Sequence, residues 1–270
     1  MKKFFLVLAS ASQIATVDKF KFPDILINHQ SKISTFFKPR DYIKTLFIDS
    51  GGFFSSLLQG KYRTSDEDYL QFVRKVKANM FALRDYPCEP DILKKWRRTV
   101  ADCIEMTVNH HIKLLELCTD IEAEPIAVLQ GWNVDDYLNC IDRFRDQGLI
   151  TKYMAIGSIC RRGSQRQVRK IINIIGKELN NVKLHGFGIS LSVLRYKDVW
   201  DSLYSADSGA WDFSSRWKKL RCGLSKREAS ELGFVRFLHR LQHLKLSHEL
   251  QSNLLFFLNS NSTYTEEEAT

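Results

Sequence analysis

The stretch of this sequence that decides the fold reads Tyr204-Ser205-Ala206-Asp207-Ser208-Gly209-Ala210-Trp211. A short run, 201–204, leads into a single acid, which small residues and then a tryptophan follow. In a β/α chain this order is typical of a strand that delivers one carboxylate at its C-terminal end, where small residues let a substrate approach closely. The same residues could instead begin a helix with Asp207 as its N-cap.

A second stretch has a similar order and favours the strand interpretation. It reads Leu46-Phe47-Ile48-Asp49-Ser50-Gly51-Gly52-Phe53. In both stretches apolar residues lead into an acid, and Ser-Gly follows. Because the C-terminal ends of parallel strands meet at one end of a barrel, the two stretches predict a paired-carboxylate site formed by Asp49 and Asp207.

The rest of the chain alternates between strand-like and helix-like segments. We predict strands at 4–9, 45–48, 80–83, 125–129, 153–156, 182–187 and 204–207, and helices at 65–77, 91–118, 134–147 and 164–178. About seven β/α units with short links predict an α/β fold, a compact TIM-like (β/α) barrel with its site at the strand C-termini. No eighth strand is evident, although 25–27 is a short apolar piece. We expect one catalytic barrel domain over 1–258, which includes a helical C-terminal segment, and a polar tail over 259–270.

Composition and charge narrow the class of protein. The chain has 270 residues and a net charge of +9, which favours a polyanionic partner. Its six cysteines are scattered without a Cys-x-x-Cys pair, which argues for a reducing, cytoplasmic location and against a disulfide framework or a zinc ribbon. The apolar run near the start is shorter than the ~7–15 residues of a signal peptide, so we predict a buried first strand. No run is long enough to span a membrane.

Four motifs in order give the chain a resemblance to a known superfamily. Residues 48–53, 128–131, 155–158 and 187–188 fall in the order and spacing of the tRNA-guanine transglycosylase superfamily. Over roughly residues 45 to 217 the chain resembles its DNA-directed branch, the deazapurine DNA-modification proteins of phages and bacteria and their relatives in antiviral defence. The longer match includes 130–132, 157–162, 184–188 and 205–211.

This resemblance implies a role for each acid. Asp207 matches the family's nucleophile, which attacks C1′ of a nucleoside and displaces the base. Asp49 matches the acid that acts as proton donor and acceptor. The chemistry suits these residue types, because one carboxylate can trap an oxocarbenium-like sugar while a second acid moves the proton. We expect neither a metal nor an organic cofactor.

Further residues match positions that bind the base. Asp85 and Gln130 match positions that read its edge, with Gly157 and Ser158 beside them. Two simpler interpretations stay open, since Asp85 could be a helix N-cap before Pro87 and Gln130 could bond to a neighbouring loop. Aromatic residues that could stack on the base are Phe53, Trp132 and Trp211, although any one of them could equally be a core or rim residue.

Basic residues follow the ends of two predicted strands. They would ring the barrel mouth, where the backbone of double-stranded DNA must lie while one base is flipped out. The candidates for phosphate contacts are Arg161, Arg162, Arg166, Arg216, Lys218 and Lys219.

The sequence departs from the tRNA enzymes of the superfamily after the nucleophile. Those enzymes carry a Cys-x-Cys-x-x-Cys plus His zinc module, whereas here only Cys222, His239, His243 and His248 follow. His239 and His243 have the i, i+4 spacing of helix zinc ligands. The apolar stripe of this helix places them on its polar face, however, which favours a solvated or phosphate-facing surface over a metal site and makes tRNA a poor candidate substrate.

We therefore predict an enzyme that cleaves the N-glycosidic bond of a base in DNA. The short chain has little surface to shield an intermediate from water, so the first prediction is excision of a modified base by a hydrolytic DNA glycosylase in phage defence. The alternative is a transglycosylase that exchanges guanine for a 7-deazaguanine. A non-catalytic DNA-binding module would explain the charge but not two strand-end acids, and a cysteine enzyme would use Cys160 with His185.

Overall fold

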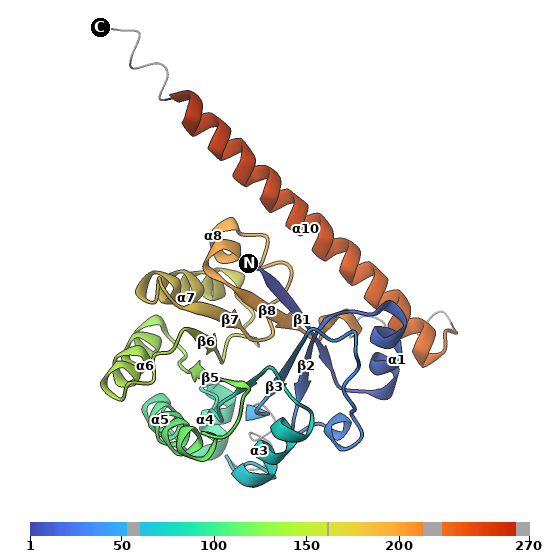
Figure 1. The fold of residues 1–270 in the computed structure, drawn as a ribbon. Coiled ribbons are helices and arrows are strands. Elements are labelled where there is room, and N and C mark those ends of the chain that lie inside the picture. Colours follow the sequence, from blue (N-terminus) through green and yellow to red (C-terminus); the bar gives the residue numbers. More distant parts are fainter. Residues whose placement is uncertain (53–59, 161, 213–222, 263–270) are drawn as a thin grey trace, which may run out of the picture.

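Eight parallel strands close into a barrel in the order of the chain (Figure 1). The structure is a computed structural model that describes residues 1–52, 60–160, 162–212 and 223–262, with side chains up to 252. The barrel closes where β8 pairs with β1, with Phe5 opposite Asp207. The predicted TIM-like barrel is confirmed. Its strands are β1 (Lys3–Leu8), β2 (Asp24–Asn28), β3 (Thr45–Asp49), β4 (Met80–Ala82), β5 (Glu124–Leu129), β6 (Tyr153–Ile156), β7 (Lys183–Gly186) and β8 (Ser205–Ser208).

The eighth strand is β2, which the sequence analysis left unassigned. It holds the short apolar piece 25–27 and pairs with β1 on one side and β3 on the other. Asp24 and Asn28 give this strand polar ends, so only three apolar residues in a row mark it. A strand that is buried on both faces shows no alternation of polar and apolar residues. Three apolar residues are too few to distinguish a strand from a loop.

Helices form a ring outside the barrel (Figure 1). The predicted helix over 91–118 is wrong in one respect, because it is broken in two. Arg97 adopts a left-handed conformation (φ 53°) that ends the first part, and Thr99 forms a capping box with Asp102 that begins the second. The helices are α1 (Ala11–Phe20), α3 (Asp66–Lys75), α4 (Pro90–Trp96), α5 (Val100–Leu117), α6 (Val134–Asp146), α7 (Gln165–Glu178), α8 (Lys197–Ser202) and α10 (Lys226–Ser262), with a 3₁₀ helix, η1 (Lys32–Thr35).

The strands separate the hydrophobic core into two parts, one inside the barrel and one between the strands and the surrounding helices. Alternate residues of each strand face the barrel axis or the helices. Inside the barrel, Phe5 and Phe47 pack with ring centroids 5.6 Å apart. His185 and Phe187 lie beside Phe47, at 5.1 and 5.8 Å between ring centroids. The barrel is therefore filled by side chains, and a ligand can enter only near its end.

The long helix α10 is anchored to the barrel at both ends of its described side chains. Phe234 packs against Phe20 of α1, with ring centroids 4.6 Å apart, and Phe237 packs against Phe4 of β1 at 5.6 Å. Further along, Nε2 of His248 donates a hydrogen bond to the carbonyl of Leu194 at 2.8 Å. The helix thus crosses the outside of the barrel and continues beyond it (Figure 1). None of the described helices combines the length and apolar character needed to cross a membrane.

A buried arginine fixes the segment that precedes α3. The guanidinium of Arg84, directly after β4, donates to the carbonyls of Thr64 and Ser65 and to the carboxylate of Asp66, at 2.9 to 3.0 Å. It also lies 4.3 Å from the ring centroid of Tyr62. Because Tyr62 in turn bonds the backbone of Asp85, this arginine connects the outer loop to the barrel end.

Replacing Arg84 should destabilise the fold strongly. Arg84→Met would remove the four hydrogen bonds of a buried guanidinium, although Asp66 would keep His110 and Lys113 as partners. Hydrogen bonds to charged groups contribute about 1.5–3 kcal/mol each. Arg74→Met is the matched control, since Arg74 pairs with Asp120 on the surface and surface pairs contribute little. Urea unfolding should show a large drop in midpoint for the first variant and almost none for the second. Equal midpoints would contradict this account of Arg84.

Candidate functional site

A cavity of about 570 Å³ opens at the C-terminal end of the barrel. Its walls carry four acids, one each from the ends of β3 and β8 and two from the loop after β4: Asp49, Asp207, Asp85 and Glu89. Asn28, Gln130, Gly157 and Ser158 also line it. A larger hollow of about 670 Å³ lies at the opposite end, beside Lys2, Lys183 and Tyr204. Because TIM-barrel chemistry takes place at the C-terminal ends of the strands, the first cavity is the candidate site.

Asp207 is held firmly by one of its two carboxylate oxygens. Its Oδ1 accepts a hydrogen bond from the backbone N–H of Gly188 at 2.9 Å and lies 3.1 Å from Nε2 of His185. Within the described residues, Oδ2 has no hydrogen-bond partner, so this oxygen is open to a ligand in the cavity. Asp207 lies within β8, which excludes the N-cap interpretation.

His185 positions this carboxylate. Its Nδ1 lies 2.8 Å from the hydroxyl of Ser205, which also bonds the hydroxyl of Tyr153. With Nε2 protonated, the ring donates to Asp207 and accepts from Ser205. Both ring nitrogens are therefore engaged, and His185 is not available as a base for Cys160. This argues against the cysteine enzyme considered above, in which His185 would activate Cys160.

Asp49 is a partly buried acid whose pKa lies near neutral pH. Its Oδ2 accepts from Nδ2 of Asn28 at 2.7 Å, and its Oδ1 accepts from the N–H of Gly51 at 3.3 Å. Loss of solvent around the carboxyl is the largest cause and, together with the negative charges of Asp85 and Asp207, raises the pKa of Asp49 to about 7 against the lowering effect of the two hydrogen bonds. A carboxyl group with a pKa near 7 can both give and take a proton at neutral pH.

A second group of polar residues lines the same cavity. Oδ1 of Asp85 accepts from the hydroxyl of Ser50 at 3.0 Å, and Oδ2 accepts from Nε2 of Gln130. Burial raises the pKa of Asp85 to about 6. The helix that follows is capped by Glu89, so Asp85 is not its N-cap.

Ser158 connects this group to Glu89. Its hydroxyl lies 2.6 Å from Oε1 of Gln130 and 2.9 Å from Oε2 of Glu89, and it accepts the N–H of Cys88 at 2.8 Å. A side chain at Gly157 would overlap the Gln130 amide, which is why glycine is required there. The structure thus brings Asp85, Gln130, Gly157 and Ser158 together, as predicted. The Gln130 amide is held by protein partners, so reading of a base by these residues stays a prediction.

The aromatic residues expected to stack on a base are not arranged as predicted. Trp211 is 1% exposed and packs against Phe234, while its indole N–H donates to the Val7 carbonyl at 3.1 Å. It is a core residue and the prediction for it is wrong, because the chain turns it outward from the barrel axis after β8. Trp132 does not line the cavity, and Phe53 lies outside the described residues. Among the described residues, the aromatic side chain that lines the cavity is that of Phe187.

The predicted phosphate contacts are only partly described. Arg162 stacks on Trp132, 3.9 Å from the ring centroid, and donates to the carbonyls of Ser158 and Gly131 at 2.9 and 3.3 Å. Its first role is therefore to fix the ends of β5 and β6, which the sequence did not indicate. Arg166 is exposed at the start of α7. The other candidates, Arg161, Arg216, Lys218 and Lys219, lie outside the described residues.

Sequence reasoning missed Asn28, Glu89 and the role of His185. Asn28 ends the strand that was not assigned, and Glu89 looked like an ordinary acid between two prolines. His185 directly precedes Gly186 in the motif 184–188, and this position could have indicated a site residue. His239 and His243 lie exposed on α10 with ring centroids 6.4 Å apart. In the part of the chain that the structure describes, no three His, Cys, Asp or Glu residues are grouped to hold a metal ion.

The protonation of Asp49 can be measured without any substrate. A ¹³C NMR titration of its carboxyl should give a pKa of about 7. Asp207→Asn should lower this pKa by removing a nearby negative charge, and Asn28→Ala should raise it by removing a hydrogen bond to the ionised form. Since the folded protein holds a proton that the unfolded chain has lost, the contribution of Asp49 to stability should fall as pH rises from about 4 to about 7. A pKa near 4 that neither substitution moves would contradict this description.

Comparison with known proteins supplies the family. No curated protein matches the sequence. A family model does match, over residues 30–249, and this range contains all four acids named above. It describes DpdA, DeoxyPurine in DNA protein A, a DNA-directed family that is similar to the tRNA-guanine transglycosylases. The resemblance drawn from the sequence motifs is confirmed, and the chain belongs to the DpdA family.

Proposed function

We propose that this protein is a DNA transglycosylase that exchanges a guanine in DNA for a 7-deazaguanine base. The observation that carries the proposal is the pairing of two unlike acids in one cavity. Asp49 has a pKa of about 7, while Asp207 has one oxygen fixed by Gly188 and His185 and the other directed to no protein partner among the described residues. One acid is suited to move a proton and the other to attack carbon.

In the first half of the reaction, Oδ2 of Asp207 attacks C1′ of the nucleotide. The bond between C1′ and the base breaks, and its electron pair leaves with the base. Asp49 gives its proton to the departing base and becomes a carboxylate. The products are a glycosyl ester on Asp207 and a free guanine, which must leave the cavity before the second half can begin.

In the second half, the incoming base enters the same cavity. Its ring N–H loses a proton to the Asp49 carboxylate, and the ring nitrogen forms a bond with C1′. The ester bond breaks and restores the carboxylate of Asp207. Atoms and charge balance over both halves, since Asp49 recovers its proton and the DNA strand stays intact throughout.

The base edge would meet Asp85 and Gln130. Asp85 offers carboxylate oxygens to N–H donors, and guanine is the base whose edge carries both a ring N–H and an amino group. Phe187 on the cavity wall offers an apolar face. These contacts are part of the proposal and rest on the placement of the residues around one cavity.

The family supports exchange over excision. The sequence analysis placed excision in phage defence first because the chain is short, but the DpdA family is similar to enzymes that exchange bases. Both reactions pass through the same ester on Asp207 and differ only in what attacks it. The family is therefore the reason why exchange is the function proposed.

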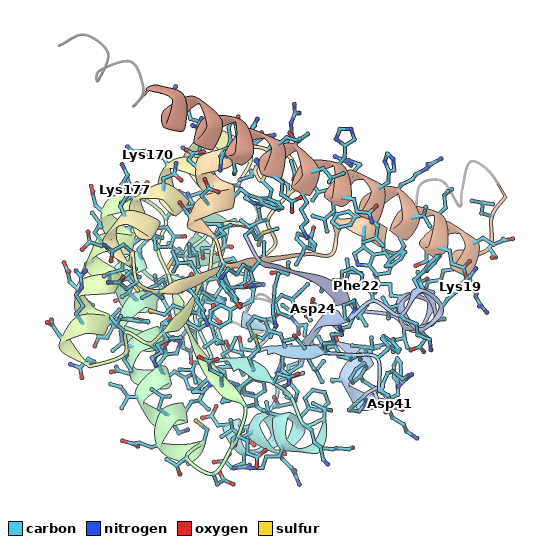
Figure 2. The ribbon with its side chains drawn as sticks, turned by 45° about the horizontal axis from the view of Figure 1, so that its top comes forward. Lys19, Phe22, Asp24, Asp41, Lys170 and Lys177 are labelled. Carbon is cyan, nitrogen blue, oxygen red and sulfur yellow. The ribbon has the colours of Figure 1, made fainter. Side chains whose placement is uncertain are left out.

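The proposal is tested by supplying a labelled base. Purified protein, duplex DNA and labelled 7-deazaguanine should give labelled, alkali-stable strands and an equal amount of free guanine. Asp207→Asn should lower the rate at least about 10³-fold, because the nucleophile is lost, and should still bind DNA. Asp41→Asn, an exposed change far from the site (Figure 2), is the matched control.

Each other outcome points to a different function. Alkali-labile abasic sites that form without added base would show excision and refute exchange. Full activity of Asp207→Asn would remove this residue as the nucleophile. Wild-type protein that binds DNA but releases no base under any condition would favour the non-catalytic module.

A further inference from the structure

A series of neighbouring hollows lies between the cavity and helix α10. The cavity shares Cys160 and Gly188 with a hollow of about 160 Å³, and that hollow shares Ser190 and Ser192 with another of about 350 Å³. A last hollow of about 410 Å³ shares Leu191 and Arg240 with its neighbour. We call the last two together the α10 groove. It lies between residues 190–195 and residues 233–247 of α10.

Positive charge lines this groove and negative charge is absent from it. Its lining includes three exposed arginines, Arg195, Arg236 and Arg240, together with His239 and His243. Over the described residues, no acid lines the groove or the hollow between it and the cavity, and none of the three arginines has an acidic partner.

The acids of α10 on either side of the groove are already paired. Glu231 bonds Lys19 and Arg227, and Glu249 lies 3.9 Å from Lys245. From 232 to 248 the helix contains no acid at all. The positive charge of the groove is therefore not neutralised within the described part of the chain and is available to an anion.

The cavity has the opposite charge. Its described lining holds four acids and no lysine, arginine or histidine. Charge is thus separated between neighbouring hollows, with acids in the cavity that a base would enter and cations in the α10 groove. This separation matches a nucleic acid, whose bases present hydrogen-bond donors and whose backbone is anionic.

The spacing of the cations fits a repeating anion. Arg236, Arg240 and His243 follow the i, i+4, i+7 pattern, so they lie along one face of α10. They span a rise of about 10 Å along the helix axis, which is about three steps of 3.4 Å in duplex DNA. The hydroxyls of Ser190, Ser192 and Ser247 also line the groove and can donate to phosphate oxygens.

The groove is formed before any ligand binds. Phe234 and Phe237 are buried and fix one end of this part of α10 against α1 and β1. The hydrogen bond from His248 to the Leu194 carbonyl fixes the helix to the other wall of the groove. Arginines on two rigid walls lose less freedom on binding than arginines on a loose segment.

We propose that the α10 groove binds the phosphate backbone of DNA beside the nucleotide whose base enters the cavity. This inference rests on the proposed function for the identity of the nucleic acid. A base that leaves the stack draws its own backbone to the cavity mouth, and the adjoining phosphates must then cross the neighbouring surface. The α10 groove is such a neighbouring surface, because only one small hollow lies between it and the cavity.

The test compares two triple variants that lose the same charge. One carries Arg195→Gln, Arg236→Gln and Arg240→Gln. The control carries Lys75→Gln, Lys170→Gln and Lys177→Gln on the outer surfaces of α3 and α7, where Figure 2 shows Lys170 and Lys177. Affinity for a labelled 30-base-pair duplex is measured by fluorescence anisotropy over a range of salt concentrations. Thermal melting of both variants confirms that they are folded.

The groove variant should bind DNA roughly tenfold more weakly, and its plot of log K against log salt should be shallower by about 2 to 3 units of slope. The control should keep the wild-type slope to within about one unit. With the full reaction, the groove variant should show a higher KM for DNA and an unchanged kcat.

Two results would overturn the inference. Equal slopes for the two variants would show that the groove makes no special contact with DNA, and tighter binding of an RNA duplex by the wild-type groove would assign it to RNA. Because binding is measured without turnover, these results are independent of the exchange reaction. If the slope falls as expected but no labelled base is incorporated by the wild type, the proposed function fails and the groove remains a DNA-binding surface.

Discussion

The crowding of four carboxyl groups around one small cavity, three of them buried and Asp49 partly buried, is the constraint on which the rest of the site depends. Four ionised acids in a space of about 570 Å³ would repel one another strongly. The protein meets this constraint in two ways. Asp49 keeps its proton up to about neutral pH, and each of the other carboxylates lies within hydrogen-bond distance of at least one donor. Asn28, Ser50, Gln130, Ser158 and Gly188 are all placed by this need, and each comes from the end of a strand or the loop directly after it.

The barrel supplies these donors because its strands are in register. The pairing of β7 with β8 sets His185 opposite Ser205, and the pairing of β8 with β1 sets Asp207 opposite Phe5. These two pairings place the His185 ring between a serine and the carboxylate. A slip of one residue would turn Asp207 from the barrel interior to the helices. The nucleophile proposed here is thus positioned by backbone pairing before any side chain is considered.

Much of this arrangement can be predicted from sequence, because strand-end acids are a local signal. The stretches that contain Asp49 and Asp207 each show an apolar run, an acid and small residues, and both acids lie where that pattern places them. Local signals fail where the decisive contact is distant in sequence. Nothing near Trp211 shows that Phe234 will cover it, and nothing near Arg162 shows that Trp132 will stack on it. The break between α4 and α5 was readable, since Thr99 and Asp102 form a standard capping box, but the apolar spacing on both sides hid it.

The hydroxyl of Ser158 has one hydrogen but faces two oxygen acceptors, Gln130 Oε1 and Glu89 Oε2, while one of its lone pairs receives the N–H of Cys88. It can donate to only one of the two at a time. When the hydrogen points to Gln130, the contact with Glu89 is a hydrogen bond only if Glu89 carries a proton itself. When it points to Glu89, the Gln130 amide can rotate and present its NH₂ group to Ser158 and its oxygen to a protonated Asp85. The wall of the cavity therefore has two hydrogen-bond arrangements that differ in which groups donate and which accept, while the heavy atoms hardly move. Whether Glu89 or Asp85 carries a proton selects between them.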